Sequence, residues 1–469
     1  MLFNSIDFAF FLPIVFCLFW MINGKDLKYQ NLLLLASSYV FYGWWDWRFL
    51  SLLAFSSGLD FFVGSALYKQ QDEKKRKLLF LISMGVNLGL LGFFKYYNFF
   101  AESFVEAFSF FGQKTDLNTL NIILPVGISF YTFQSMSYAI DIYRGKLTPT
   151  KDLIAFLAFV SFFPQLVAGP IERASHLLPQ FLTKKRFSYD MVAAGLKIML
   201  WGFFMKVVVA DRLALYVQAV YGNVDMHTGL SFIVATIFFA FQIYCDFGGY
   251  SLIALGCARL FGFDLMENFR RPYFSGSFRE FWGRWHISLS TWFKDYLYIP
   301  LGGNRVSPSR NYFNLFTTFV VSGLWHGANW TFVIWGGIHG SYQILEREFA
   351  KISWLKLPKV LQVVLVFALT CFAWIFFRAA SLHEAMHIVT TILTHPGGSL
   401  YTGDLGIFAF SIMAILMLLT VDYINEYYPD FSLLNHQVVY VRFATIVIML
   451  IYIVSLGVFD GSQFIYFQF

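Results

Sequence analysis

Three histidines of this sequence lie in or beside apolar segments, where an ionisable side chain is costly and is therefore a candidate for function. His326 lies in Gly-Leu-Trp-His-Gly, His286 in Trp-Gly-Arg-Trp-His and His339 in Gly-Gly-Ile-His-Gly. An imidazole titrates near neutral pH and can take a proton from a hydroxyl group during acyl transfer. The small residues Gly323 and Gly327 would let a backbone or a slender acyl chain approach His326. The alternative is a core histidine that forms a hydrogen bond with a neighbouring helix. The cost of placing an ionisable side chain in the membrane does not alone decide between a catalytic and a structural histidine.

The spacing of these histidines does not favour metal chemistry. They lie too far apart in the sequence for a local zinc site, and the four cysteines are scattered without a Cys-x-x-Cys pair. His383-Glu-Ala-Met-His387 matches the H-E-x-x-H zinc motif. No third ligand is obvious downstream, and so short a pattern occurs by chance. The sequence therefore predicts no metal.

The composition places these residues in a membrane. Of 469 residues, 58% are hydrophobic, 21% aromatic and 13% charged, whereas about one-quarter of the residues of a soluble domain are charged. No soluble fold buries so many apolar side chains, but lipid can accommodate them. The net charge of +6 is modest and is concentrated in loops. It indicates orientation in the bilayer rather than nucleic-acid binding.

Long apolar runs predict an all-α polytopic membrane protein with about 11 to 12 transmembrane helices. The first run lacks the basic start and the cleavage site of a removable signal peptide. Residues 154–171 and 311–323 are interrupted, so we expect them to enter the membrane and return. No linker divides the chain, so residues 1–469 are expected to form one membrane domain. The expected spans are residues 8–21, 30–42, 49–67, 78–100, 122–140, 191–210, 229–243, 251–263, 331–345, 360–377, 406–423 and 442–459.

Basic loops predict the orientation. Residues 74–77, 144–151 and 184–186 carry clusters of Lys and Arg, which favour the cytoplasmic side. The side of the carboxyl terminus depends on how the later half-spans are counted and stays open.

The longest polar stretch, residues 264–310, is predicted to lie in the cytoplasm or at the membrane interface. Its aromatic residues and leucines recur at three- and four-residue steps and are flanked by Arg and Lys. This pattern is typical of an amphipathic helix that lies in the interface. The residues of this face are Trp282, Trp285, His286, Leu289, Trp292, Phe293, Tyr296 and Leu297.

Two further acidic positions interrupt apolar surroundings. Asp246 lies in Tyr-Cys-Asp-Phe-Gly-Gly, where it could line a cavity or bind a ligand group. A polar network that ties helices together is the slightly favoured interpretation. Glu172 and Arg173 follow Ala-Gly-Pro-Ile and are interpreted as a solvated pair at the membrane boundary.

Seven stretches spread over the chain resemble the membrane-bound O-acyltransferase family, in the branch that contains the membrane subunits of alginate and peptidoglycan O-acetyltransferases. Together they are specific, although any single one would be weak. They are Met1-Leu-Phe-Asn-Ser5, Leu124-Pro-Val-Gly-Ile-Ser-Phe-Tyr-Thr-Phe133, Phe163-Pro-Gln-Leu-Val-Ala-Gly-Pro-Ile171, Phe247-Gly-Gly-Tyr-Ser251, Phe281-Trp-Gly-Arg-Trp-His286, Tyr298-Ile-Pro-Leu-Gly-Gly-Asn304 and Gly323-Leu-Trp-His-Gly327.

The resemblance implies roles for the histidines and a fold. His326 would be the catalytic histidine, His286 the second family histidine near the cytoplasmic mouth or along a tunnel, and His339 structural. The implied fold is a ring of tilted helices with re-entrant segments, and a central tunnel pierces its thin centre. Acetyl-coenzyme A would enter from the cytoplasm, guided by the basic stretch at residues 264–310, because a cationic cleft concentrates anions. Candidate residues for binding it are Arg279, Arg284, Trp285 and Lys294.

The last six residues, 464–469, read Phe-Ile-Tyr-Phe-Gln-Phe and resemble the terminal hexapeptide of this branch. Tyr466 is a candidate acyl relay, because a phenol near a histidine base is a plausible nucleophile. The alternative is an aromatic anchor at the membrane interface.

The implied function is that of a multi-pass O-acetyltransferase of the bacterial inner membrane. It would pass acetyl groups from cytoplasmic acetyl-coenzyme A, with no metal, toward a polysaccharide such as alginate or peptidoglycan. A separate extracytoplasmic transferase would complete the reaction. One alternative is a D-alanyl transferase of the same family. Another is a transporter or scaffold, although the paired inverted halves typical of many transporters are not found.

Overall fold

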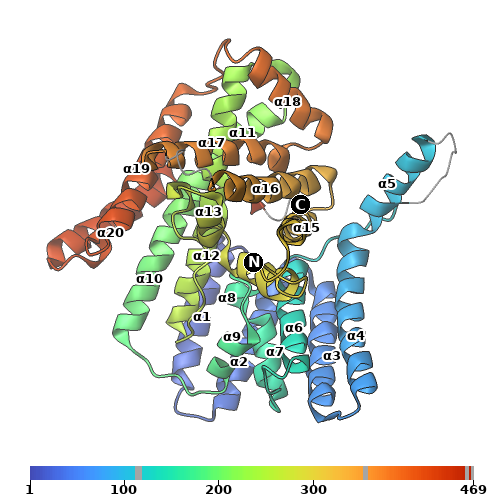
Figure 1. Cartoon of the computed structure of the whole chain (residues 1–469). Helices are drawn as coiled ribbons and strands as arrows, with labels where there is room; N and C mark the ends of the chain where they lie inside the picture. The colour runs from blue at the N-terminus through green and yellow to red at the C-terminus, as the bar shows by residue number, and fades with distance from the viewer. Residues whose placement is uncertain (111–118, 352–356, 460–463, 466–469) are drawn as a thin grey trace. The chain divides into compact units, whose positions relative to one another are not determined.

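The computed structural model describes residues 1–110, 119–351, 357–459 and 464–465, and every regular element in that part of the chain is helical (Figure 1). The prediction of an all-α polytopic membrane protein is confirmed. The α-helices are α1 (Ile6–Met21), α2 (Leu27–Asp46), α3 (Leu50–Lys69), α4 (Glu73–Leu91), α5 (Tyr97–Phe110), α6 (Ile128–Tyr143), α7 (Leu153–Ser161), α8 (Phe163–Leu166), α9 (Ala174–Phe181), α10 (Tyr189–Phe203), α11 (Asp211–Tyr221), α12 (Gly229–Leu260), α13 (Phe278–Arg284), α14 (Ile287–Phe293), α15 (Pro308–His326), α16 (Trp330–Phe349), α17 (Lys359–Arg378), α18 (Leu382–Thr394), α19 (Leu405–Tyr427) and α20 (Val439–Leu456).

Seven described helices are long and apolar enough to cross a membrane, and α1 is a shorter apolar helix. Two of the seven contain π-helical segments, η2 (Gly92–Tyr96) between α4 and α5 and η3 (Phe204–Ala210) between α10 and α11. The seven are Phe49–Lys69, Glu73–Ser109, Tyr189–Tyr221, Gly229–Leu260, Lys359–Arg378, Leu405–Tyr427 and Val439–Leu456.

Two expected interruptions are absent from the structure. The separate spans expected at 229–243 and 251–263 form the single helix α12. Its glycine pair, Gly248 and Gly249, does not break the helix. Gly249 instead allows the backbone at Gly202 to approach, because an added Cβ would lie 2.7 Å from the Gly202 carbonyl oxygen. The segment 311–323, expected to be interrupted, lies within the continuous helix α15.

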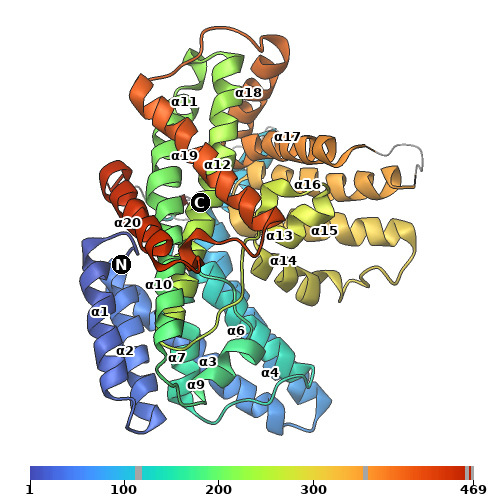
Figure 2. The same cartoon turned by 90° about the vertical axis from the view of Figure 1, so that its left-hand side faces the viewer.

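The chain forms two compact units, Met1–Gly195 with Ala254–Met266 and Leu196–Ile253 with Glu267–Phe469. The prediction of one membrane domain, and those of a ring and a tunnel, stay predictions. In the first unit α1 packs on α2, and α3, α4 and α6 lie side by side (Figures 1 and 2). A buried carboxylate joins two of them: Asp60 of α3 accepts hydrogen bonds from Ser83 Oγ at 2.6 Å and Asn87 Nδ2 at 2.9 Å on α4.

The interrupted segment 154–171 contains only the nine-residue helix α7 and the four-residue helix α8. At 1.5 Å per residue, neither is long enough to cross the roughly 30 Å of a bilayer core. The three basic segments lie at one end of the first unit (Figure 1), with residues 74–77 at the start of α4 rather than in a loop. There Arg76 donates to the carbonyl oxygen of Tyr143 at 2.6 Å. This placement agrees with the expectation that all three loops face the same side.

The interpretation of Glu172 as a solvated residue is wrong, because its side chain is fully buried. It accepts a hydrogen bond from the backbone N–H of Met266 at 2.6 Å and bonds His176 Nδ1 at 2.8 Å. The hydrogen bond to Glu172 raises the pKa of His176. The Gly-Pro-Ile sequence before Glu172 therefore leads the chain inward rather than to solvent.

The expected amphipathic helix within 264–310 is also corrected. The chain forms two seven-residue helices, α13 and α14, and the π-helical segment η6 (Lys294–Tyr298), with a break at Trp285 and His286. Most of the expected interfacial face is buried inside the second unit, with Trp285 and Leu289 each 1% exposed. Helical periodicity did not reveal the break, because both short helices keep the same spacing of large apolar residues.

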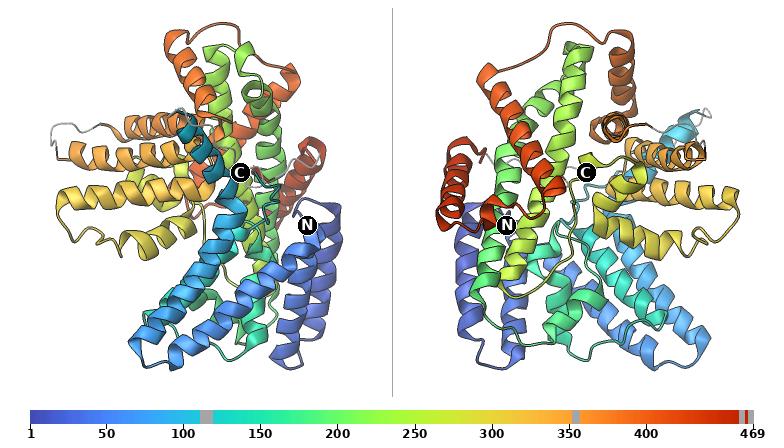
Figure 3. Two further views of the ribbon diagram at one scale, coloured as in Figure 1. Left: turned by 90° about the vertical axis from the view of Figure 1, so that its right-hand side faces the viewer. Right: turned by 60° about the vertical axis from the view of Figure 1, so that its left-hand side comes forward.

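In the second unit α15 and α16 pack along their length (Figures 2 and 3). Glycines allow the approach. An added Cβ at Gly323 would lie 2.1 Å from the carbonyl oxygen of Phe332, and one at Gly336 would lie 2.2 Å from that of Phe319. The small residues before His326 thus admit another backbone.

Replacing Gly336 with Ala should separate α15 from α16, because a Cβ cannot overlap a backbone carbonyl. We expect a loss of about 1 to 3 kcal/mol of stability, measured by thermal unfolding of the detergent-solubilised protein. Gly337→Ala is the matched control. Its Cβ would meet only the Phe316 ring at 3.6 Å, and a helical alanine is favoured over glycine by about 1 kcal/mol. Equal unfolding temperatures for the two variants would contradict the close approach.

Candidate active site

His326 is the last residue of α15, and its side chain is enclosed in an aromatic environment. Its ring centroid lies 5.1 Å from that of Trp335 on α16 and 5.4 Å from that of Phe377 on α17. The chain can turn away after His326 because Gly327 has no side chain. A Cβ at Gly327 would lie 2.1 Å from the Phe332 ring. The helix end therefore holds the imidazole in a dry pocket between three helices.

His286 occupies the break between α13 and α14 with a left-handed backbone, φ 43°. Such a conformation costs a residue with a Cβ about 1 to 3 kcal/mol, and strain of this kind clusters at functional sites. His286 and Arg271 are the two non-glycine residues with positive φ in the described chain. The side chain of His286 is fully buried, and burial lowers its pKa, so the ring is neutral at physiological pH.

The side-chain amide of Asn268 sets the tautomer of His286. Asn268 Oδ1 lies 3.1 Å from His286 Nδ1 and also accepts from the backbone N–H and the hydroxyl of Ser288, at 3.2 and 2.9 Å. Because a backbone N–H can only donate, the acceptor atom must be the amide oxygen. Asn268 Nδ2 in turn donates to Ser251 Oγ on α12 at 3.2 Å. His286 therefore carries its proton on Nδ1, which leaves Nε2 as the basic nitrogen.

The structure brings His286 and His326 together, with ring centroids 6.3 Å apart. Phe247 of α12 packs edge-on against His286 at 4.6 Å. Two imidazoles at this separation, enclosed by aromatic rings, can accept and return protons.

His339 lies one aromatic ring beyond this pair. Its ring centroid is 4.9 Å from that of Trp335, which itself contacts His326, and its ring lies parallel to that of Phe281. Neither ring nitrogen of His339 has a hydrogen-bond partner within the described part of the chain. The described residues of the chain contain no group of three or more His, Cys, Asp or Glu side chains that could hold a metal ion.

A cavity of about 930 Å³ lies in the second unit, and residues close in sequence to both histidines line it. It is lined by Ile287 and Leu289, next to His286, and by Ser322, one helical turn before His326. Among the residues that the structure describes, four cationic side chains and no carboxylate line it: Arg279, Lys294, Arg305 and Arg347. A basic cleft of this kind attracts anions.

The four residues expected to bind the cofactor divide into two pairs. Arg279 and Lys294 line the cavity and form no ion pair with any carboxylate that the structure describes. Arg284 instead bonds Glu280 at 2.7 Å and Glu426 of α19 at 2.8 Å. Trp285 is buried against the ring of Trp374, with centroids 5.1 Å apart.

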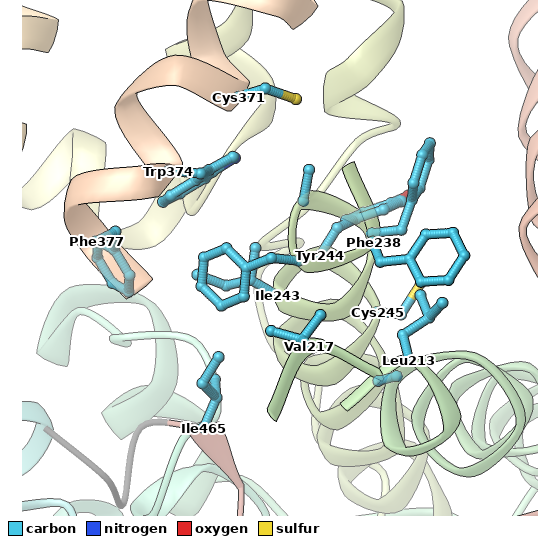
Figure 4. Close-up of a cluster of buried hydrophobic side chains, with 14 of the residues drawn as sticks. Leu213, Val217, Phe238, Ile243, Tyr244, Cys245, Cys371, Trp374, Phe377 and Ile465 are labelled. Carbon is cyan, nitrogen blue, oxygen red and sulfur yellow. The ribbon is translucent and has the colours of Figure 1, made fainter. Parts of the chain in front are cut away.

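Asp246 belongs to a buried network, as favoured above. Lys206 Nζ of η3 lies 2.6 Å from Asp246 Oδ1 on α12 and 2.7 Å from Asp211 Oδ1 on α11. Asp246 Oδ2 also accepts the backbone N–H of Ile465 at 2.7 Å. Ile465 packs with residues of α11, α12 and α17 in one apolar cluster (Figure 4). Tyr466, the candidate relay, lies outside the described residues.

Sequence reasoning missed Asn268, Ser288, Arg347 and Lys206. Lys206 could have been found, because a lysine inside an apolar span is costly for the same reason as a histidine. Asn268 lies in a polar stretch, where nothing marks one amide among many.

Comparisons with known proteins identify a family. The model of the membrane-bound O-acyltransferase family matches residues 150–383, which include both histidines and the cavity. The chain is 42% identical over 399 residues to a probable alginate O-acetylase of Azotobacter vinelandii, covering 84% of this chain and 78% of that protein. It is 36% identical over 435 residues to a peptidoglycan O-acetyltransferase of Helicobacter pylori, covering 85% and 81%.

A more distant similarity joins the chain to a teichoic acid D-alanyltransferase of Bacillus subtilis, at 27% identity over 283 residues, covering 56% of this chain and 71% of that protein. The all-helical membrane fold, the buried histidine pair and relatives matched over most of their length point to one class of enzyme. The chain belongs to the membrane-bound O-acyltransferase family and is an acyltransferase.

Proposed function

We propose that this acyltransferase takes acetyl groups from acetyl-coenzyme A at the cytoplasmic face of a bacterial inner membrane and passes them outward for O-acetylation of a polysaccharide. The observation that carries the proposal is the pairing of two buried imidazoles, His286 and His326, in the unit that also contains a cavity lined by cations. Membership of an acyltransferase family removes the transporter or scaffold alternative.

His326 would act as the catalytic base. The acceptor hydroxyl oxygen forms a bond to the thioester carbonyl carbon while the imidazole takes the hydroxyl proton. The carbon–sulfur bond then breaks, and the proton passes to the departing thiolate. His286, held as the Nδ1–H tautomer by Asn268, would present Nε2 toward the same reaction space. The aromatic enclosure supports this chemistry, because preorganised polar groups stabilise developing charge more strongly in a site of low dielectric constant than in water.

The cavity suits a coenzyme A thioester. Its volume of about 930 Å³ lies within the range of about 300 to 1,000 Å³ that is usual for ligand sites. Arg279, Lys294 and Arg305 are exposed on its lining, where they could pair with the phosphate groups. Leu289 and Ser322 also line the cavity, and both are buried. The acyl end would therefore point inward while the phosphates stay near solvent.

The relatives support acetyl transfer to a polysaccharide, since the two most fully matched above are an alginate O-acetylase and a peptidoglycan O-acetyltransferase. The D-alanyl alternative rests on relatives with lower identity over a smaller share of the chain. We propose a separate extracytoplasmic transferase as the partner that completes transfer to sugar. Tyr466 as the acyl relay stays a prediction.

Replacing His326 with Ala should abolish release of free coenzyme A from acetyl-coenzyme A by the purified protein. General acid–base catalysis contributes about 10²- to 10⁴-fold, so we expect a loss of that size with unchanged thermal unfolding. The exposed His395→Ala is the matched control. Equal turnover in the parent and His326→Ala would exclude His326 as the base and favour His286.

Replacing Asn268 with Leu should lower kcat and leave KM for the donor unchanged. The substitution removes the acceptor that orients His286, and a misplaced catalytic group can cost about 10²-fold. Asn268→Asp keeps the acceptor oxygens and adds a negative charge beside the ring, which raises the pKa of His286. Because the ring is then protonated at higher pH, the acidic limb of the pH–rate profile should shift to higher pH than in the parent. An unchanged pH–rate profile in Asn268→Asp would contradict the role of this contact.

Replacing Arg279 and Lys294 with Gln should raise KM for acetyl-coenzyme A by about ten-fold for each charge removed, since a hydrogen bond to a charged group contributes about 1.5 to 3 kcal/mol. The effect should shrink as salt concentration rises, because salt screens exposed charges. Arg310→Gln removes an exposed cation that stacks on Phe313 at 5.2 Å and does not line the cavity. A rise in KM of equal size for Arg310→Gln would show that the cavity is not the donor site.

A further inference from the structure

The end of the described chain is bound to a buried charge cluster in the second unit. Ile465 donates its backbone N–H to Asp246 Oδ2 at 2.7 Å. The other carboxylate oxygen of Asp246 lies 2.6 Å from Lys206 Nζ, which also pairs with Asp211 at 2.7 Å. All three ionisable side chains are at most 5% exposed. One lysine thus serves two carboxylates, and one oxygen of Asp246 is used by the chain end.

The apolar contacts of the chain end agree with the hydrogen bond. Phe464 and Ile465 are 1% and 2% exposed. The Phe464 ring packs against Tyr250 and Phe247 of α12, with centroids 4.8 and 5.8 Å apart. A backbone N–H that donates to a carboxylate in an apolar interior makes a strong contact, because water does not compete for either group.

The same turn of α12 also supports the histidine site. Phe247 contacts Phe464 with its ring and packs edge-on against His286 at 4.6 Å. Ser251, one turn further along, accepts the hydrogen bond of Asn268, which orients His286. The chain end and the catalytic pair are therefore separated by one aromatic ring.

We propose that Asp246, held by Lys206, is a positioning residue that fastens residues 464–465 beside the histidine pair and so supports the packing of Phe247 against His286. The hydrogen bond fixes the backbone at Ile465, and the buried Phe464 ring anchors the segment against α12. The inference rests on the proposed function only for its effect on turnover. The attachment itself can be measured without any substrate.

The attachment is tested by digestion of the purified full chain with a carboxypeptidase, followed by intact mass. In the parent, release of Ile465 and Phe464 should be slow. In Asp246→Leu digestion should continue through Ile465 and Phe464 at least ten-fold faster, because the acceptor is lost while Lys206 keeps Asp211. Asp422→Leu is the matched control, since Asp422 is a buried carboxylate of the same unit that accepts from Tyr244 at 3.0 Å. Equal digestion of Asp246→Leu and either the parent or Asp422→Leu would overturn the proposal.

The effect on turnover is tested from the other side of the hydrogen bond, without altering the charge cluster. Ile465→Pro removes the N–H donor, whereas Ile465→Val keeps it together with most of the packing. We expect Ile465→Pro to lower kcat about ten-fold with KM for acetyl-coenzyme A unchanged, and Ile465→Val to match the parent. The double variant Asp246→Leu with Ile465→Pro should be no slower than the slower single variant, because both substitutions remove the same hydrogen bond.

Two outcomes of the turnover test would overturn the positioning role. One is a double variant whose losses multiply, and the other is an unchanged kcat in Ile465→Pro. If the parent itself releases no coenzyme A, the proposed function fails, and the digestion test still decides whether Asp246 holds the chain end.

Discussion

Polar groups enclosed by apolar side chains must find their partners within the protein, because lipid offers none. This constraint organises both units. In the first unit Asp60 is satisfied by Ser83 and Asn87. In the second unit Lys206 lies between two carboxylates, and the Asn268 amide serves the histidine site on one side and α12 on the other. Each set joins segments that are distant in the sequence, so satisfying the polar groups also selects which helices pack together.

The candidate active site gains its order from packing on all sides. His326 is held at a helix end whose position depends on the glycine-mediated approach of α15 to α16. His286 is held in a strained backbone conformation by Asn268 and by the edge of Phe247. Neither imidazole depends on a flexible loop. Preorganised groups of this kind lose little free energy to reorientation during the reaction.

Irregular structure brings the cations of the cavity together. Arg279 lies on α13, Lys294 begins η6, and Arg305 lies in the turn that precedes α15. A single straight helix through this region would have placed them along one axis. The break at His286 instead folds the segment around the cavity, so the same distortion that buries the His286 imidazole also gathers the cations of the cavity.

The amino-acid sequence by itself determined the membrane class, the all-helical fold and the candidate histidines, because composition and the cost of buried ionisable groups are local properties. Its resemblance to a known family also predicted Arg279, Arg284, Trp285 and Lys294 as candidates for binding the cofactor. Only the tertiary structure decided that Arg284 pairs with Glu426, that Glu172 is buried, and that Asn268 orients His286. These outcomes depend on which distant segment lies opposite each side chain. Helical periodicity describes one face of a segment and does not contain that information.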